Sequence, residues 1–179
     1  MVSYAKQNPD KVNYSAPSAS FQLIAELFNG KTGSKFQHIP YKGSNDAITA
    51  VMTQDVTMTL IDTGPALTAL QGGRVKAMAV TSGERLKDLP QVPTMTELGV
   101  DINVTFWSGL LAPAGTPKPV VDKLHAEVMR ITALPDVKER LSTLGAEANR
   151  MTPAEFAHWF KTEIPAMAKI VKDEKITVE

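Results

Sequence analysis

The sequence has no cysteine and no net charge, because its 179 residues include 19 Lys and Arg against 19 Asp and Glu. Without cysteine the chain has no disulfide and no thiolate chemistry, which is compatible with an oxidising or a reducing compartment. Without an excess of basic residues, the composition favours neither nucleic-acid binding nor attachment to a membrane surface through a basic patch. Any anionic ligand must therefore be bound by local geometry.

Long apolar runs and the common catalytic motifs are also missing. No segment approaches the ~20 apolar residues of a membrane span, and the first residues, MVSYAKQNPDKV, lack the basic and apolar regions of a signal peptide. There is no Gly-x-Ser-x-Gly elbow and no HExxH motif, and His38, His125 and His158 have no partner in the pattern for a metal or a catalytic dyad. These absences argue against hydrolytic and metal chemistry, and no cofactor is indicated.

Residues 1–111 alternate short β-branched apolar runs with segments of helical period. This alternation predicts an α/β fold with a Rossmann-like, open and mostly parallel sheet flanked by helices. Strands are expected at 12–15, 36–41, 56–61, 75–82 and 102–111, and helices at 20–28, 44–53, 65–71 and 94–98. Gly30, Gly72 and Gly99 are expected as left-handed helix stops, and Thr94 with Glu97 predicts a capping box.

The connector APAGTPKP begins a different organisation, because residues 112–179 have helical period throughout. One helix is expected to start at Thr116, a shorter one to end at Gly145, and a third to open at Thr152 with a kink at Pro165. The third helix carries an apolar stripe formed by Phe156, Trp159, Phe160, Ile164, Met167, Ile170 and Val171. So wide an aromatic stripe needs a partner surface.

Small polar turns follow four of the expected strands: SAPSAS at 15–20, YKGSN at 41–45, DTG at 62–64 and TSG at 81–83. In an open parallel sheet, ligands bind at the carboxyl ends of the strands. Helix N-termini at that edge offer unpaired N–H groups, each end contributing about 0.3–1 kcal/mol to binding of a nearby anion. Several such ends would form an anion site, and the alternative is that the polar residues only cap helices.

Nucleotide binding is disfavoured, because YKGSNDAI is neither a Walker loop nor a three-glycine dinucleotide fingerprint. Lys42 is expected to be a solvated surface residue. Asp62 ends an apolar strand, so its carboxylate is either a helix N-cap or a ligand contact.

Seven segments occur in a recognisable order: NPDKVNYS, IPYKGSNDAITAV, LIDTGPAL, GRVKAMAVTS, LPQVPTMTELG, FWSGLLAPAGTP and LGAEANRMTPAEF. Together they resemble the extracytoplasmic solute receptors of tripartite tricarboxylate transporters, also called Bug proteins. The resemblance implies a periplasmic receptor with the two lobes of a type II periplasmic-binding-protein fold, and it implies no catalysis. Such a receptor closes on a small carboxylate, which could be a dicarboxylate, a tricarboxylate, an aromatic acid or an amino acid, and delivers it to membrane transporter subunits.

By this resemblance, residues 1–111 are the second, ligand-binding lobe, and residues 112–179 are helices that pack back on the first lobe. The first lobe has no counterpart here, so the chain is expected to be the carboxyl-terminal portion of a receptor. Its implied ligand-binding residues are Ser18, Ala19, Ser20, Gly43, Ser44, Asn45, Asp62 and Thr63. Amides and hydroxyls of the first two turns would hold a carboxylate, and Asp62 would meet an amino or hydroxyl group of the ligand.

The sequence departs from the family at the first turn, where a shorter SAPSAS with Ala19 and Gln22 replaces a glycine-rich turn with Thr and His. The chain alone is expected to bind carboxylates weakly and to form a homodimer through its exposed C-terminal helices. Two other interpretations stay open. One is a standalone protein-interaction module that uses the C-terminal helices, and the other is an α/β enzyme with Asp62 as acid or base.

Overall fold

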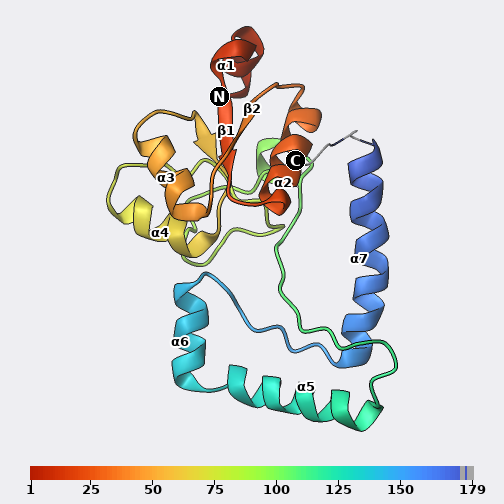
Figure 1. Ribbon diagram of the computed structural model, residues 1–179. Helices are drawn as coiled ribbons and strands as arrows, with labels where there is room; N and C mark the ends of the chain where they lie inside the picture. Colours follow the sequence, from red (N-terminus) through yellow and green to blue (C-terminus); the bar gives the residue numbers. More distant parts are fainter. Residues whose placement is uncertain (174–175, 177–179) are drawn as a thin grey trace. The chain divides into compact units, whose positions relative to one another are not determined.

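The computed structural model describes residues 1–173 and 176, which form two compact units. The sheet unit comprises Met1–Phe106 and the described residues from Ile170 onward, and the helical unit comprises Trp107–Lys169. Figure 1 labels their elements along the chain. Among the described residues, none of the helices combines the length and the apolar character needed to cross a bilayer.

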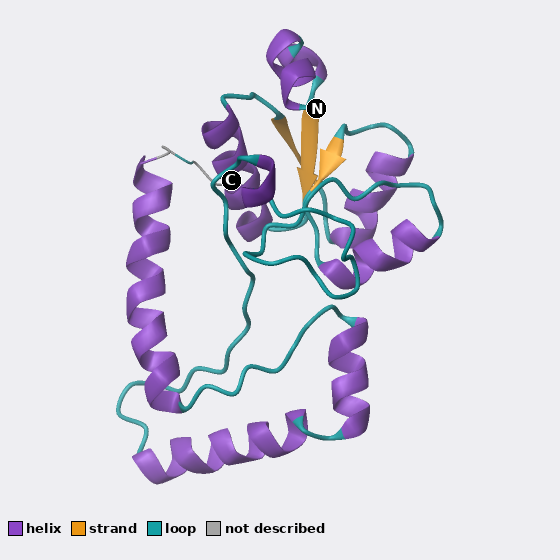
Figure 2. Cartoon of the chain, turned by 180° about the vertical axis from the view of Figure 1, so that it is seen from behind, coloured by secondary structure: helices purple, strands orange, loops and turns teal. Residues whose placement is uncertain are grey.

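The sheet unit contains three parallel strands in the order β2-β1-β3, with β1 (Asn13–Ala16) between β2 (Gln37–Pro40) and β3 (Met58–Thr59). Figure 2 shows the three arrows running in the same direction. Parallel strands need long crossovers, which are helical here. The helices of this unit are α1 (Val2–Gln7), α2 (Ala19–Thr32), α3 (Ser44–Met52) and α4 (Thr63–Gln71), with short 3₁₀ turns η1 (Pro9–Lys11) and η2 (Thr96–Leu98).

Helices cover both faces of the sheet, as two hydrogen bonds from β1 show. Successive residues of a strand point to opposite faces. The Tyr14 hydroxyl donates to Glu26 of α2 at 2.5 Å, whereas the hydroxyl of the next residue, Ser15, donates to the carbonyl of Ala47 in α3 at 3.4 Å. The α2 and α3 helices therefore lie on opposite faces, as right-handed crossovers require.

The hydrophobic core lies between α2 and the sheet, and other segments complete it. Ile24 and Phe28 of α2 pack with Tyr14 and Phe36, all nearly inaccessible to solvent. The core also includes Ala5, Val12, Ala16, Phe21, Ala25, Leu27 and Ile102, with Ile170 and Ile176 partly buried against it. Residues from α1 to the C-terminal segment thus hold the sheet and its helices in place.

Three of the five predicted strands are confirmed, β1 shifted by one residue and β2 and β3 in shorter form, and the other two are wrong. In 75–82 only Val80 pairs, through one isolated bridge to Thr94, and 102–111 forms no strand. A β-branched run becomes a strand only where a neighbouring backbone pairs with it. Among the described residues, the segment 102–111 bonds to another extended backbone only once, from the Val104 N–H to the Thr81 carbonyl at 2.8 Å, and this single bond does not make a strand.

Helix ends show which local signals were reliable. The capping box is confirmed, because the Thr94 N–H donates to Glu97 Oε2 at 2.7 Å and the Glu97 N–H donates to Thr94 Oγ1 at 3.1 Å. Gly99 is left-handed as predicted, with φ 79°. Gly30 is wrong as a stop, because it lies inside α2, which ends at left-handed Gly33, and Gly72 is right-handed with φ −74°.

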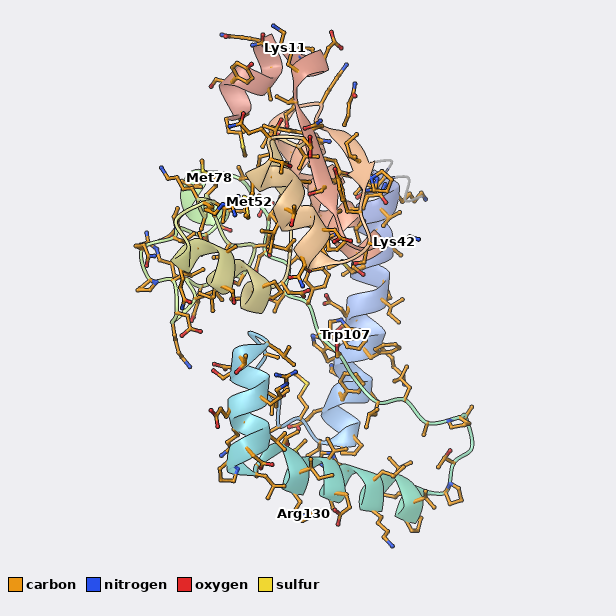
Figure 3. All side chains as sticks on the ribbon, turned by 60° about the vertical axis from the view of Figure 1, so that its left-hand side comes forward. Lys11, Lys42, Met52, Met78, Trp107 and Arg130 are labelled. Atoms are coloured by element: carbon orange, nitrogen blue, oxygen red, sulfur yellow. The ribbon has the colours of Figure 1, made fainter. Side chains whose placement is uncertain are left out.

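The helical unit contains α5 (Lys118–Thr132), α6 (Pro135–Thr143) and most of α7 (Pro153–Asp173), which continues through Pro165. None of its residues is buried. The ring of Trp107 meets the rings of Phe156, Trp159 and Phe160 edge-on, with centroid distances of 5.7, 5.1 and 5.6 Å, and Figure 3 shows Trp107 beside α7. Trp107 is therefore a packing residue, and it covers the aromatic part of the predicted stripe.

Candidate functional site

The N-termini of three helices lie at one edge of the parallel sheet. Each strand leads directly into a helix, β1 into α2, β2 into α3 and β3 into α4, so these helices begin at the carboxyl ends of the strands. In the order β2-β1-β3, the connection from β1 to β2 passes through α2 on one face of the sheet, and the connection from β2 to β3 passes through α3 on the other. Open α/β sheets bind ligands at such a switch point, here between β1 and β3.

Side chains leave these three helix ends uncapped. Ser18, Gly43 and Asp62 hold the N-cap positions of α2, α3 and α4, and at none of them does a side chain bond to the helix N–H groups. The N–H groups of Ala19, Ser20, Ser44, Asn45 and Thr63 likewise make no hydrogen bond to any described residue. Capping is the commoner use of these residue types, but it is not what their side chains do here.

Capping does occur elsewhere in the same chain. At the start of α7 the Thr152 N–H donates to Glu155 Oε2 at 2.8 Å, and the Glu155 N–H donates to Thr152 Oγ1 at 3.3 Å. The bonds from Thr152 hold the pKa of the Glu155 carboxyl below its usual range. Side-chain capping is thus used at some helices of this protein, whereas α1, α5 and α6 also begin without it. What distinguishes α2, α3 and α4 is that their open N–H groups lie together at one edge of the sheet.

Gly43 sets the geometry of the second turn. Its φ of 93° and ψ of 160° lie in a region that only glycine adopts at low cost. A Cβ at this position would meet no atom within 4 Å. The glycine is therefore required by the backbone conformation and not by crowding, and it presents the first N–H groups of α3 to solvent.

Asp62 joins the second and third turns. Its Oδ2 accepts a hydrogen bond from the Ser44 hydroxyl at 3.2 Å, although Asp62 itself is exposed and precedes α4. The sequence left two roles open for the Asp62 carboxylate, a helix N-cap or a ligand contact, and the side chain does not cap α4. A carboxylate here repels an anionic ligand group and attracts a hydroxyl or amino group.

The eight residues expected to bind ligand all lie in these three turns, at the same edge of the sheet. Ser44 and Thr63 are half-buried and the other six are exposed. The fourth turn, TSG, does not join them, because no strand of the sheet precedes it. There the Thr81 carbonyl accepts the Val104 N–H at 2.8 Å, and the Ser82 hydroxyl donates to the Glu84 carbonyl at 2.7 Å.

The remaining candidates do not form a second site. His38 lies in β2 as predicted and stacks on Tyr14 with ring centroids 5.1 Å apart. Within the described part of the chain, no group of three or more His, Cys, Asp or Glu residues could hold a metal ion. A cavity of about 400 Å³ is lined by residues that include Pro9, Glu26 and Phe36, at the amino-terminal edge of the sheet and away from the three turns.

One α2 residue was not assigned to the site from the sequence. Gln22 lies one turn beyond Ser18 and is 4% exposed, although it is polar. The sequence marks it only as a departure from the family's first turn. A glutamine at a core-facing position of an amphipathic helix is the signal that could have identified it.

A family model described as the tripartite tricarboxylate transporter family receptor matches residues 1–176. The chain belongs to this receptor family. The family consists of receptors and not of enzymes, so it gives no support to Asp62 as a catalytic acid or base.

Three solved structures are similar to this chain in fold and in sequence. MatC (Rpa3494) from Rhodopseudomonas palustris with bound malate is 32% identical, with a TM-score of 0.78, and the match covers 95% of this chain and 60% of that one. Rpa4515 from R. palustris with adipate is 28% identical, with a TM-score of 0.86 and coverage of 98% and 60%. The periplasmic binding protein BugD is 32% identical, with a TM-score of 0.80 and coverage of 99% and 61%. These neighbours confirm the α/β fold class.

The chain spans about half the length of the curated relatives it matches. Two of these relatives, 31% and 32% identical to this chain, have 54% and 53% of their length covered.

Proposed function

We propose that this chain binds a small carboxylate solute, as part of a periplasmic receptor that delivers the solute to tripartite tricarboxylate transporter subunits. The observation that supports this most directly is the set of three uncapped helix N-termini at the carboxyl edge of one sheet. Such ends attract anions through their open N–H groups and helix dipoles. Malate and adipate, found on two structural neighbours, are carboxylates of this kind.

In the proposed complex, each turn has a distinct part. The amides and hydroxyls of Ser18, Ala19 and Ser20 and of Gly43, Ser44 and Asn45 hold a carboxylate. Asp62, with Thr63, accepts a hydrogen bond from a hydroxyl or amino group of the ligand. The Ser44 bond orients the Asp62 carboxylate for this contact.

The 179-residue chain alone is expected to bind malate with a millimolar dissociation constant. If a whole receptor binds with micromolar affinity, about 8 kcal/mol, then half of the contacts supply about 4 kcal/mol, which is millimolar binding. Titration followed by backbone amide NMR is expected to shift the signals of residues 18–20 and 43–45. Shifts confined to the amino-terminal cavity, or micromolar binding by a verified monomer, would contradict the proposal in this form.

A second proposal concerns the helical unit, which exposes large apolar side chains. Leu110 is 81% exposed and Leu111 69%, and Val120, Leu124 and Ile164 are also exposed. Apolar surface of this extent favours association. We propose that a second copy of the chain covers it, with a separate partner protein as the alternative occupant.

Light scattering over a range of concentrations is expected to show a mass rising from monomer to dimer. Leu111→Lys places a charge in the exposed segment and is expected to shift this transition to higher concentration. Leu98→Lys, at an exposed leucine of the sheet unit, adds the same single charge and serves as the control. A constant monomer mass at the highest concentration would count against self-association.

A further inference from the structure

A row of three polar residues on α2 faces the sheet. Gln22, Glu26 and Asn29 are four and three residues apart, so they share one side of the helix. Glu26 accepts the Tyr14 hydroxyl of β1, and Asn29 bonds to both the backbone N–H and the carbonyl of Phe36, at 3.0 Å each. This side of α2 therefore packs on β1 and on the residue that precedes β2.

Only Gln22 of this row lacks a partner. It is 4% exposed, and its side-chain amide makes no hydrogen bond to any described residue. Buried amides are nearly always paired, because an unpaired one loses its hydrogen bonds to water without replacement. The amide atoms are not fully enclosed, unlike the buried and unpaired Nε2 of His38, so the amide is the part of Gln22 that reaches the surface.

The direction of the side chain follows from helix geometry. Side chains of an α-helix lean toward its N-terminus. From position 22 this direction leads to the first turn of α2, where Ala19 and Ser20 have unbonded N–H groups. The amide of Gln22 is thus directed toward the carboxyl edge of the sheet and away from Glu26.

We propose that Gln22 is a ligand-binding residue, whose side-chain NH₂ donates to an oxygen of the carboxylate held at the α2 N-terminus. This inference rests on the proposed function and adds a contact to it. The amide supplies a directed donor without a charge, which a carboxylate oxygen can accept. Its own carbonyl remains able to accept from a ligand hydroxyl, which suits a hydroxy acid such as malate.

The test is Gln22→Met, which keeps the length of the side chain and removes the amide. Binding of malate is expected to weaken about tenfold or more, as for loss of a hydrogen bond to a charged group. The melting temperature is expected to stay about the same, because the Gln22 amide makes no hydrogen bond to a described residue that the substitution would remove. In the unsubstituted protein, the side-chain NH₂ signals that disappear in Gln22→Met are expected to shift on addition of malate.

The matched control is Asn29→Leu, on the same side of α2 and two turns further on. Its amide bonds to the Phe36 backbone, to Glu26 Oε2 and to the Ser34 hydroxyl, so the variant is expected to lose thermal stability. A structural role for Gln22 would give the same loss in Gln22→Met, and that result would overturn the inference.

Failure of the inference and failure of the proposed function give different results. If the unsubstituted chain binds malate and Gln22→Met binds it equally well, Gln22 is not a ligand contact and the proposed function stands. If the unsubstituted chain binds neither malate nor adipate at millimolar concentration, the proposed function fails and this inference fails with it.

Discussion

Replacing Gly43 by valine is expected to abolish detectable carboxylate binding and to lower the free energy of unfolding of the sheet unit by about 1–3 kcal/mol. The backbone at Gly43, with φ 93° and ψ 160°, is accessible to glycine and not to a β-branched residue. The space around the position is open, so the valine side chain itself would meet no obstacle. The cost is therefore one of backbone strain, relieved only by moving the turn that presents the first N–H groups of α3.

The control for this variant is Gly73→Val. Gly73 also has a positive φ, 66°, and open space around it, but it follows the C-terminal end of α4. This variant is expected to lose a similar amount of stability in urea unfolding and to bind malate as the unsubstituted chain does. If Gly43→Val lost stability but kept its malate affinity, the α3 N-terminus would not be part of the binding site.

The positions of the three site turns could be predicted because they depend on local signals. Each turn combines the end of a β-branched run with residues that start helices, and both signals lie within a few positions of each other in the sequence. The bond between Ser44 and Asp62 could not be predicted, because it depends on how α3 and α4 pack. Whether a polar residue caps its helix or leaves it open is likewise decided in three dimensions.

The burial of Gln22 could not be predicted either, because it too depends on how helices and strands pack. Its burial follows from the packing of α2 on β1, whereas the sequence shows only a polar residue between Phe21 and Leu23. The polarity of Glu26 and Asn29 on the same side hides the signal further, since a polar side of a helix normally predicts a solvent-exposed one. Here Tyr14 and the backbone of Phe36 provide the partners that allow polar residues to face the sheet.

The wrong strands show the limit of composition as a guide. Val75 to Ser82 and Ile102 to Leu111 have the residues of strands, but pairing needs a neighbour that the sequence of one segment cannot reveal. In the first segment only Val80 finds one, through the bridge to Thr94. In the second segment, Ile102 is buried in the core of the sheet unit, whereas Leu110 is 81% exposed to solvent. The predicted strand therefore combines a buried end and an exposed end.

Ile102→Ala is expected to lower the free energy of unfolding of the sheet unit by about 2–5 kcal/mol, as for other large core residues truncated to alanine. Ile102 is 1% exposed and belongs to the cluster formed by α2 and the sheet, although its segment forms no strand. Because the segment has no strand ladder and only one backbone bond to a neighbouring segment, from Val104 to Thr81, the burial of Ile102 is expected to be the main interaction that holds it in place. The carbonyl of Ile102 accepts only a long bond, 3.4 Å, from the Thr96 hydroxyl.

Urea unfolding followed by far-ultraviolet circular dichroism would measure this loss, with Leu98→Ala as the control. Leu98 lies four residues earlier and is 56% exposed, so its truncation is expected to change stability by less than about 0.5 kcal/mol. Equal effects of the two variants would mean that Ile102 is not a core residue in solution. A large effect of Ile102→Ala alone would show that a segment outside the sheet is fixed by one buried side chain, and that the stability of the sheet unit depends on a residue far beyond Thr59, the end of its last strand.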